Sequence, residues 1–327
     1  MGVAGAENPF FAVRNLTKHF PIRAGVFLRT TGYVRAVDAV SFDIKESTTL
    51  GLVGESGCGK TTIARMILHL EKPTSGQIIV NGRDTIGIQE EQLREFRRGV
   101  QMVFQDPYSS LNPHRSIKDL VGEPYIVHRI CSHQEVKGRV AAVLELVSLP
   151  ADFMHRYPHE LSGGQRQRVG IARALALNPK IIICDEPVSA LDVSIRSQIV
   201  NLLLDLQRRF GLTYLFIAHD LSLVQHVSDR IAVMYLGKIV ELASADALSI
   251  RHMHPYTEAL FSAIPVPVPE KQRTRIILSG DVPSPLNPPS GCRFRTRCPL
   301  AEALCSSQEP PLREVSPRHF VACHFRG

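Results

Sequence analysis

The tightest constraint on how this chain can fold is the glycine-rich sequence GESGCGKT at residues 54–61. It follows a short apolar run at residues 49–53 and precedes an amphipathic pattern at residues 61–70. A strand, a glycine-rich loop and a helix in this order form a phosphate-binding loop in an α/β sheet. The glycines let backbone amides converge on phosphate oxygens, and the helix adds the positive end of its dipole. This arrangement favours nucleotide binding over a glycine-rich turn that binds nothing.

Other apolar runs continue the alternation of strands and helices. Residues 100–104 and 213–218 form short apolar runs. Residues 180–184 form an unbroken run rich in β-branched side chains, which is typical of a strand buried on both faces. Residues 144–176 are mostly helical in pattern. We therefore expect an α/β fold in which strand ends meet a phosphate site.

Two adjacent carboxylates, Asp185 and Glu186, follow the strand expected at residues 180–184. Such a pair is costly at the end of a buried strand, so it favours a functional role over a merely solvated strand end. We expect Asp185 to hold Mg²⁺ through water and Glu186 to act as general base toward the attacking water. In the glycine-rich loop, we expect Lys60 to reach the β- and γ-phosphates and Thr61 to ligate the metal.

The sequence LSGGQ at residues 161–165 is far more specific than a phosphate loop. It resembles the signature motif of the ATP-binding cassette (ABC) family. Other marks of that family fall in the family's order: Gln105 after the run at 100–104, SALD at 189–192, and His219 after the run at 213–218. The resemblance implies a P-loop NTPase core of the ABC ATPase type that contains a helical subdomain.

The same resemblance implies roles for individual residues. Gln105 would touch the metal and the attacking water, Asp192 would shape a dimer contact, and His219 would hold the γ-phosphate. The signature would grip ATP bound by an opposite subunit, so that two chains close around two nucleotides. Glu186, His219 and Gln105 are thus the expected catalytic residues. The residues expected to contact the nucleotide or its metal are Phe20, Gly54, Ser56, Gly57, Cys58, Gly59, Lys60, Thr61, Thr62, Gln105, Ser162, Gly163, Gly164, Gln165, Asp185 and Asp192.

The aromatic platform for adenine is expected near the start of the chain. By resemblance it is Phe20, the last residue of the sequence LTKHF at 16–20. An insertion follows this sequence, so Phe27 and Tyr33 are alternatives. A simple place in the hydrophobic core is an equal alternative for each of the three rings.

Three further sequences resemble the ATPases of oligopeptide, dipeptide and nickel importers: VFQDPYSSLNP at 103–113, HPYTEAL at 254–260 and GDVPSP at 280–285. After residue 250 the composition changes, because 12 of the 22 prolines lie there, in stretches such as 264–269 and 283–289. Proline removes backbone donors and fixes φ, so this part should be a separate module with little regular structure. We expect a nucleotide-binding domain at 1–250, with a helical subdomain at about 106–170, and a small Pro/Cys-rich extension at 251–327.

Four cysteines crowd this extension, and the spacings between Cys292, Cys298, Cys305 and Cys323 are five, six and seventeen residues. This is not the paired close spacing of common zinc ribbons. Three close ligands and one distant ligand are typical of a [4Fe-4S] cluster. Arginines at 293, 295 and 297 would offset the negative charge of four thiolates. Resemblance to peptide-importer ATPases agrees. Zinc and unligated thiols are the alternatives. If a cluster is present, we expect it to stabilise the extension, which lacks a hydrophobic core of its own.

Composition bears on location and partners. The net charge of +7 is dispersed, so we expect no nucleic-acid partner. No apolar run approaches the about 18 residues of a spanning helix, and the start of the chain lacks a secretory pattern. We therefore expect a cytosolic protein whose link to a membrane comes through a partner. The resemblance to importer ATPases implies a peripheral place on the cytoplasmic face of the inner membrane. By resemblance it drives di- and oligopeptide import with a second, related ATPase, two permease subunits and an extracytoplasmic binding protein.

Several alternatives to this interpretation remain. A related nickel, glutathione or sugar importer could use such an ATPase, and a homodimer could replace the heterodimer. A soluble ABC ATPase of DNA repair or translation is a rival of another class, but the stretch of about a hundred residues between the loop and the signature is short for one. A regulatory subunit that binds ATP without hydrolysis is opposed by the intact Lys60, Asp185, Glu186 and His219.

Overall fold

The computed structural model describes residues 9–25, 27, 29–106, 108–264 and 275–326. The chain forms two compact units. The first unit comprises Met1–Ile44, Thr49–Asp84 and Ile217–Gly327, and the second comprises Lys45–Thr48 and Thr85–Phe216. Pro107 of the importer-like sequence and residues 265–269 of a proline-rich stretch lie outside the described residues.

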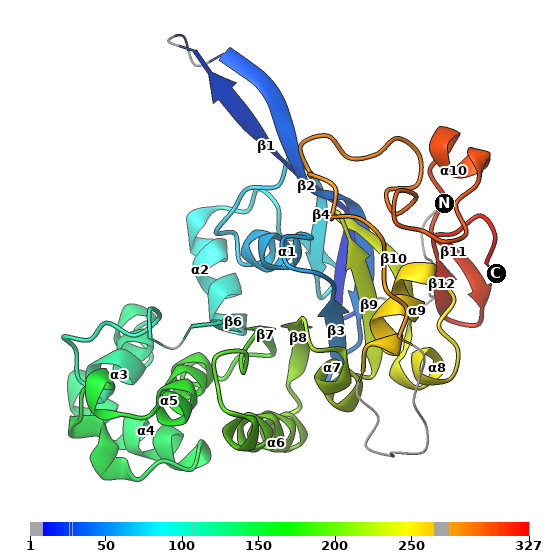
Figure 1. The fold of residues 1–327 in the computed structure, drawn as a ribbon. Coiled ribbons are helices and arrows are strands. Elements are labelled where there is room, and N and C mark those ends of the chain that lie inside the picture. Colours follow the sequence, from blue (N-terminus) through cyan, green and yellow to red (C-terminus); the bar gives the residue numbers. More distant parts are fainter. Residues whose placement is uncertain (1–8, 26, 28, 107, 265–274, 327) are drawn as a thin grey trace, which may run out of the picture. The chain divides into compact units, whose positions relative to one another are not determined.

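The first unit contains an antiparallel sheet in the order β2-β1-β4-β5. Its strands are β1 (Phe11–Ala24), β2 (Arg29–Ile44), β4 (Ser75–Val80) and β5 (Arg83–Asp84). The long hairpin of β1 and β2 is drawn in blue in Figure 1. Along the second half of β2, buried and more exposed positions alternate, as they do in a strand with one face on the core.

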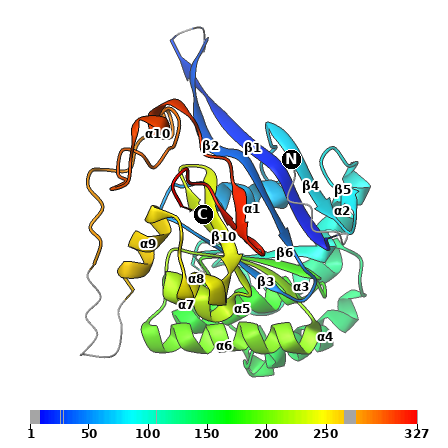
Figure 2. The same ribbon diagram turned by 90° about the vertical axis from the view of Figure 1, so that its right-hand side faces the viewer.

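A second set of strands in this unit carries the glycine-rich loop. The order is β11 (Arg313–Ser316), β12 (His319–Val321), β10 (Lys238–Ser244), β9 (Arg230–Tyr235) and β3 (Thr49–Val53). β3 and β9 pair in parallel, and the other pairs are antiparallel. Every residue of β3 is buried, which explains its unbroken apolar sequence. Figure 2 shows the C-terminal strand β12 beside β10.

Short helices complete the first unit: α1 (Lys60–Ile67), α7 (Leu221–Val227), α8 (Ala245–Ile250), α9 (Pro255–Ser262) and α10 (Ala303–Ser307). The described residues 275–302 contain no helix or strand, as their proline content predicts. The extension is nevertheless tied to a sheet, because β12 pairs with β10. Residues 251–327 thus belong to the same compact unit as the glycine-rich loop.

The second unit combines parallel strands with a group of helices. β6 (Val100–Val103) pairs in parallel with β7 (Ile181–Asp185), and most of β8 (Thr213–Ala218) also belongs to this unit. The helices are α2 (Glu90–Gly99), α3 (Ile117–Val127), α4 (His133–Leu146), α5 (Gly163–Leu175) and α6 (Val193–Phe210). Figure 1 shows α3, α4 and α5 packed against one another. The strands expected at 49–53, 100–104, 180–184 and 213–218 are confirmed, and so is the α/β class.

Candidate functional site

The glycine-rich loop joins β3 to α1 and encloses the ammonium group of Lys60. The Lys60 side chain is buried, and its Nζ donates to the carbonyl oxygens of Gly54 at 2.7 Å and Glu55 at 3.0 Å. It also lies 3.6 Å from the sulfur of Cys58. Burial raises the pKa of the Cys58 thiol, so this sulfur stays neutral beside the ammonium group. The loop therefore holds a cation at the start of a helix, where phosphate oxygens can replace its carbonyl partners.

Two glycines of the loop are required by their surroundings. Gly59 has φ of 111°, and a Cβ there would lie 2.2 Å from the carbonyl oxygen of Ala36. A Cβ on Gly54 would lie 2.2 Å from the carbonyl oxygen of Met234. Both obstacles are backbone atoms that cannot turn away as a side chain can. A larger residue at either position would displace the loop.

The other residues of the first unit that are expected to contact the nucleotide differ in exposure. Ser56 and Gly57 are exposed, whereas Thr61 and Thr62 are half-buried in the first turn of α1. His219 is exposed and follows directly after β8. The next residue, Asp220, caps α7 by accepting from the amide of Ser222 at 3.0 Å. This cap fixes the turn on which the histidine stands.

The expected catalytic pair of the second unit is in direct contact. Asp185 ends β7 and is only 3% exposed, and Glu186 follows with a positive φ of 46°. The amide nitrogen Nε2 of Gln105 donates to Oε2 of Glu186 at 2.8 Å. The carbonyl of Glu186 also accepts from the amide of Ser189 at 3.2 Å. The amide of Gln105 thus fixes the direction of this half-buried carboxylate.

The signature begins α5 and packs on the start of α6. Ser162 is the N-cap, and its hydroxyl accepts from the amide of Gln165 at 3.4 Å, while Oε1 of Gln165 accepts from the amide of Ser162 at 3.0 Å. A Cβ on Gly164 would lie 2.5 Å from Cγ2 of Ile195, so a larger residue there would displace that side chain or the start of α5. A Cβ on Gly163 would make ordinary contact, at 3.4 Å, with Cδ2 of Leu191.

Exposure of the signature fits contact with another molecule. Ser162 is exposed, and so is Asp192, the N-cap of α6. The LSGGQ sequence at the start of α5 and Asp192 at the start of α6 lie on neighbouring helices, because α5 packs on α6. Capping of α5 by its own Ser162 and Gln165 keeps the start of this helix regular.

Sequence analysis missed two arginines that hold the segment after β6. The guanidinium of Arg166 lies 4.0 Å from the ring centroid of Tyr108, a cation–π contact. Nη1 of Arg173 donates to the carbonyl of Ser110 at 2.8 Å, and burial lowers the pKa of Arg173. These contacts attach the segment after Gln105 to the signature helix. The only sequence signal was the seven-residue spacing of the two arginines, which puts both on one helix face.

The three candidate platforms for adenine differ in exposure. Phe20 lies half-buried on β1, with Nζ of Lys18 at 4.8 Å from its ring centroid. Phe27 is 83% exposed, and Tyr33 is 52% exposed. Phe20 therefore has one face already packed, which favours it as a fixed platform, and its role stays a prediction.

The four cysteines of the extension share one neighbourhood without forming a ligand group. The amide of Cys292 donates to the carbonyl of Cys305 at 2.8 Å. Burial raises the pKa of Cys292 to about 11, and the nearby thiols of Cys305, Cys298 and Cys323 add to this effect. Among the described residues, no group of three or more His, Cys, Asp or Glu side chains is placed to hold a metal ion. The structure therefore gives no support to the expected [4Fe-4S] cluster.

Two family models match this chain. The model of the ABC transporter family matches residues 37–189, and the model of the oligopeptide/dipeptide transporter C-terminal region matches residues 240–305. The oligopeptide transport ATP-binding protein AppF of Bacillus subtilis is 52% identical over 98% of this chain and 99% of its own. The probable peptide ABC transporter ATP-binding protein y4tS of Sinorhizobium fredii is also 52% identical, over 96% and 89%. The chain belongs to the ATP-binding subunits of ABC transporters.

Solved ABC cassettes agree with this assignment. The ATP-binding cassette MJ0796, in a dimeric post-hydrolysis state with ADP and Pi, matches with a TM-score of 0.64 and 31% identity over 72% of this chain and 98% of its own. The structure of cbiO1 of Clostridium perfringens, part of the ABC transporter complex cbiONQ, matches with a TM-score of 0.64 and 26% identity over 75% and 92%. The ABC ATPase fold predicted from the motifs is confirmed.

The limits of the domains stay predictions. The match to the oligopeptide/dipeptide region begins at residue 240, inside β10, whereas the composition changes after residue 250. None of the helices in the described part of this ABC subunit is long and apolar enough to cross a membrane.

Proposed function

We propose that this chain is the ATP-hydrolysing subunit of an ABC importer of di- and oligopeptides. The observation that carries the proposal is the similarity over almost the full chain to ATP-binding proteins named for peptide transport. It includes the C-terminal region, which has its own oligopeptide/dipeptide family model. The contact between Gln105 and Glu186 supports hydrolysis, because it orients the carboxylate that is the candidate base.

The roles of the nucleotide residues are part of this proposal. Lys60 neutralises the β- and γ-phosphates, and Thr61 and Asp185 hold Mg²⁺, which offsets the charge that develops on the phosphates. Glu186 accepts the proton of the attacking water, and His219 holds the γ-phosphate. Phe20 stacks on adenine. The order of the motifs and membership of the family support these assignments.

The proposal includes a second ATPase subunit. The exposed Ser162 and Asp192 suit contact with a nucleotide on another chain, and the cassette MJ0796 is a dimer in its post-hydrolysis state. We infer that a related ATPase fills this place, together with two permease subunits and an extracytoplasmic binding protein. This subunit then lies on the cytoplasmic face of the inner membrane, held there by the permeases.

The [4Fe-4S] cluster is retained as a separate proposal with its own test. Its support is the sequence spacing of Cys292, Cys298, Cys305 and Cys323 and the resemblance to peptide-importer ATPases. Iron and acid-labile sulfide are measured in protein purified without oxygen, and Cys298→Ser is compared with Cys131→Ser outside the extension. Loss of iron in the first variant alone is the expected result. A colourless protein without iron or sulfide contradicts the cluster.

The transport proposal is tested by uptake of labelled di- and oligopeptides in cells that lack the endogenous subunit. The unaltered chain and Arg65→Ala, an exposed cation on α1, are expected to restore uptake and ATP hydrolysis. Lys60→Ala is expected to restore neither, because it removes the buried ammonium group of the loop. Uptake of nickel, glutathione or a sugar without peptide would correct the cargo. ATP hydrolysis unaffected by Lys60→Ala would contradict the proposal.

A further inference from the structure

The C-terminal extension makes a direct ion pair with the glycine-rich loop. Nη1 of Arg297 lies 2.8 Å from Oε2 of Glu55, and Nη2 lies 3.2 Å from Oε1 of the same carboxylate. The pair is bidentate, and the side chain of Arg297 is only 9% exposed. A partly buried fork of this kind restrains the direction of both side chains more than a solvated surface pair does. Glu55 is the second residue of the loop that we propose to bind phosphates.

Glu55 is held at its backbone as well as at its carboxylate. Its amide donates to the hydroxyl of Tyr256, on α9, at 3.0 Å. Its carbonyl accepts from Nζ of Lys60 at 3.0 Å. Two of these three restraints come from residues beyond position 250. The conformation of this loop residue therefore depends on the C-terminal part of the chain.

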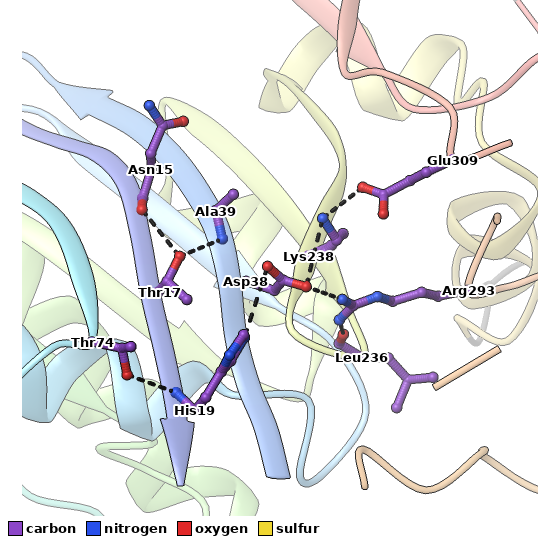
Figure 3. Close-up of polar contacts among 10 residues, drawn as sticks. All are labelled: Asn15, Thr17, His19, Asp38, Ala39, Thr74, Leu236, Lys238, Arg293 and Glu309. Carbon is purple, nitrogen blue, oxygen red and sulfur yellow. Dashed lines mark hydrogen bonds and ion pairs between the residues drawn. The ribbon is translucent and has the colours of Figure 1, made fainter. Parts of the chain in front are cut away.

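A second arginine of the same segment reaches the loop through a turn. Arg293 binds the carboxylate of Asp38 and the carbonyl of Leu236, as Figure 3 shows. The next amide in this turn, that of Gly237, donates to the carbonyl of Cys58 at 2.9 Å. Arg293 thus holds the turn that holds the far side of the loop.

Aromatic packing keeps the segment between the two arginines in place. Phe294 is fully buried, and its ring centroid lies 5.2 Å from that of Tyr235 and 5.4 Å from that of Tyr256. The amide of Arg297 donates to the carbonyl of Phe294 at 2.9 Å, which closes a turn over this packed ring. The guanidinium of Arg297 therefore projects from a fixed base.

We propose that Arg297 is a positioning residue for ATP binding: by fixing Glu55, it preorganises the phosphate loop. The loop contains several glycines, so ordering it costs more conformational entropy than ordering other residues. Contacts that order the loop before the nucleotide arrives remove this cost from the free energy of binding. The C-terminal extension thus contributes to nucleotide affinity without touching the nucleotide. This inference rests on the proposed binding of ATP by the loop.

The experiment measures the dissociation constant for a fluorescent ATP analogue, and KM and kcat for ATP, with the full chain. The variants are Arg297→Met, Glu55→Gln, the two together, and Arg295→Met as control. Arg295 is the matched control because it lies in the same segment and its guanidinium donates to the carbonyl and the hydroxyl of Ser290, not to the glycine-rich loop. Arg297→Met is expected to raise the dissociation constant and KM about tenfold, with kcat changed less than about twofold, and the control to change neither.

Coupling between the two residues separates positioning from general loss of structure. If Arg297 acts through Glu55, the double variant binds ATP no more weakly than the weaker of the single variants, and Arg297→Lys recovers part of the affinity. Single losses that multiply in the double variant would overturn the inference, as would equal affinity of Arg297→Met and Arg295→Met. Glu55→Gln provides the same comparison with a side chain of nearly unchanged shape. Absence of ATP binding by the unaltered chain would instead overturn the proposed function, and this inference with it.

Discussion

A buried carboxylate, Glu241, joins three parts of the first unit and gives a sharp test of how the extension is held. The residue is fully buried on β10. Its Oε1 accepts from the amide of Met253 at 2.7 Å and lies 2.7 Å from Nε2 of His319, on β12. Its Oε2 accepts from the amide of His254 at 2.9 Å. One side chain thus ties β10 to the start of α9 and to the C-terminal strand.

Glu241→Gln keeps the shape of this side chain but replaces one of its two acceptor oxygens with an NH₂ group, although both oxygens accept hydrogen bonds from backbone amides. The amide group that replaces an oxygen faces a backbone N–H, so that buried donor loses its partner. The lost charge-assisted bond is worth about 1.5–3 kcal/mol, and the unsatisfied donor costs about 1–3 kcal/mol. We expect the free energy of unfolding to fall by about 2.5–6 kcal/mol, which is the range of the two contributions together.

The assay is urea unfolding followed by circular dichroism, with Glu302→Gln as the control. Glu302 is an exposed carboxylate of the extension whose side chain makes no capping bond. The control is expected to unfold like the unaltered chain. A change below about 0.5 kcal/mol for Glu241→Gln, the range of ordinary surface substitutions, would refute the reasoning.

The same network predicts a dependence on pH. Burial alone would raise the pKa of Glu241, but the bonds from His319 and from the backbone amides of Met253 and His254 lower it below the ordinary 4.5. A carboxyl whose pKa is lower in the folded state stabilises the fold at pH above its unfolded pKa. This contribution is lost as the pH falls below 4.5 through the folded value. The difference in stability between the unaltered chain and Glu241→Gln should therefore shrink in that range, and a constant difference would contradict this cause.

Three further predictions follow from contacts within each unit. Gly164→Val is expected to disrupt the start of α5, because even a Cβ would lie 2.5 Å from Cγ2 of Ile195, and adding Ile195→Ala should recover part of the melting temperature. Phe294→Ala is expected to lower the free energy of unfolding by about 3–5 kcal/mol, and a loss below about 1 kcal/mol would show that the ring is not packed. Gln105→Ala is expected to lower kcat for ATP about 10- to 100-fold with little change in nucleotide affinity, because Glu186 loses its orienting bond; unchanged kcat would contradict that role.

The local sequence is enough to predict the secondary structure of the segments near the candidate site. Unbroken apolar runs predict β3 and β7, because a strand buried on both faces has no polar side to show. The glycine-rich loop is readable for a similar reason: the positive φ of Gly59 and its approach to the backbone of Ala36 admit no other residue. The capping of α5 can likewise be predicted from four consecutive residues, because the capping box joins Ser162 to Gln165.

Contacts between distant residues could not be predicted in this way. Glu55 and Arg297 are 242 positions apart, and neither is unusual in its local sequence. The pairing of β12 with β10 depends on a fold that brings a short C-terminal strand to a sheet edge. Cysteine spacing suggests a ligand set but not its geometry, and here the described thiols lie near one another without forming a metal site. A contact between residues far apart in the chain leaves no periodic pattern in the local sequence around either partner.

ATP hydrolysis by Glu186→Gln tests whether Glu186 is the general base of this ATPase. The matched control is Glu145→Gln, an exposed carboxylate on α4 of the same unit. We expect Glu186→Gln to bind ATP with unchanged affinity but to hydrolyse it at least about 100-fold more slowly, while the control hydrolyses ATP normally. Full ATP turnover by Glu186→Gln, measured with any second ATPase site also disabled, would show that Glu186 is not the general base.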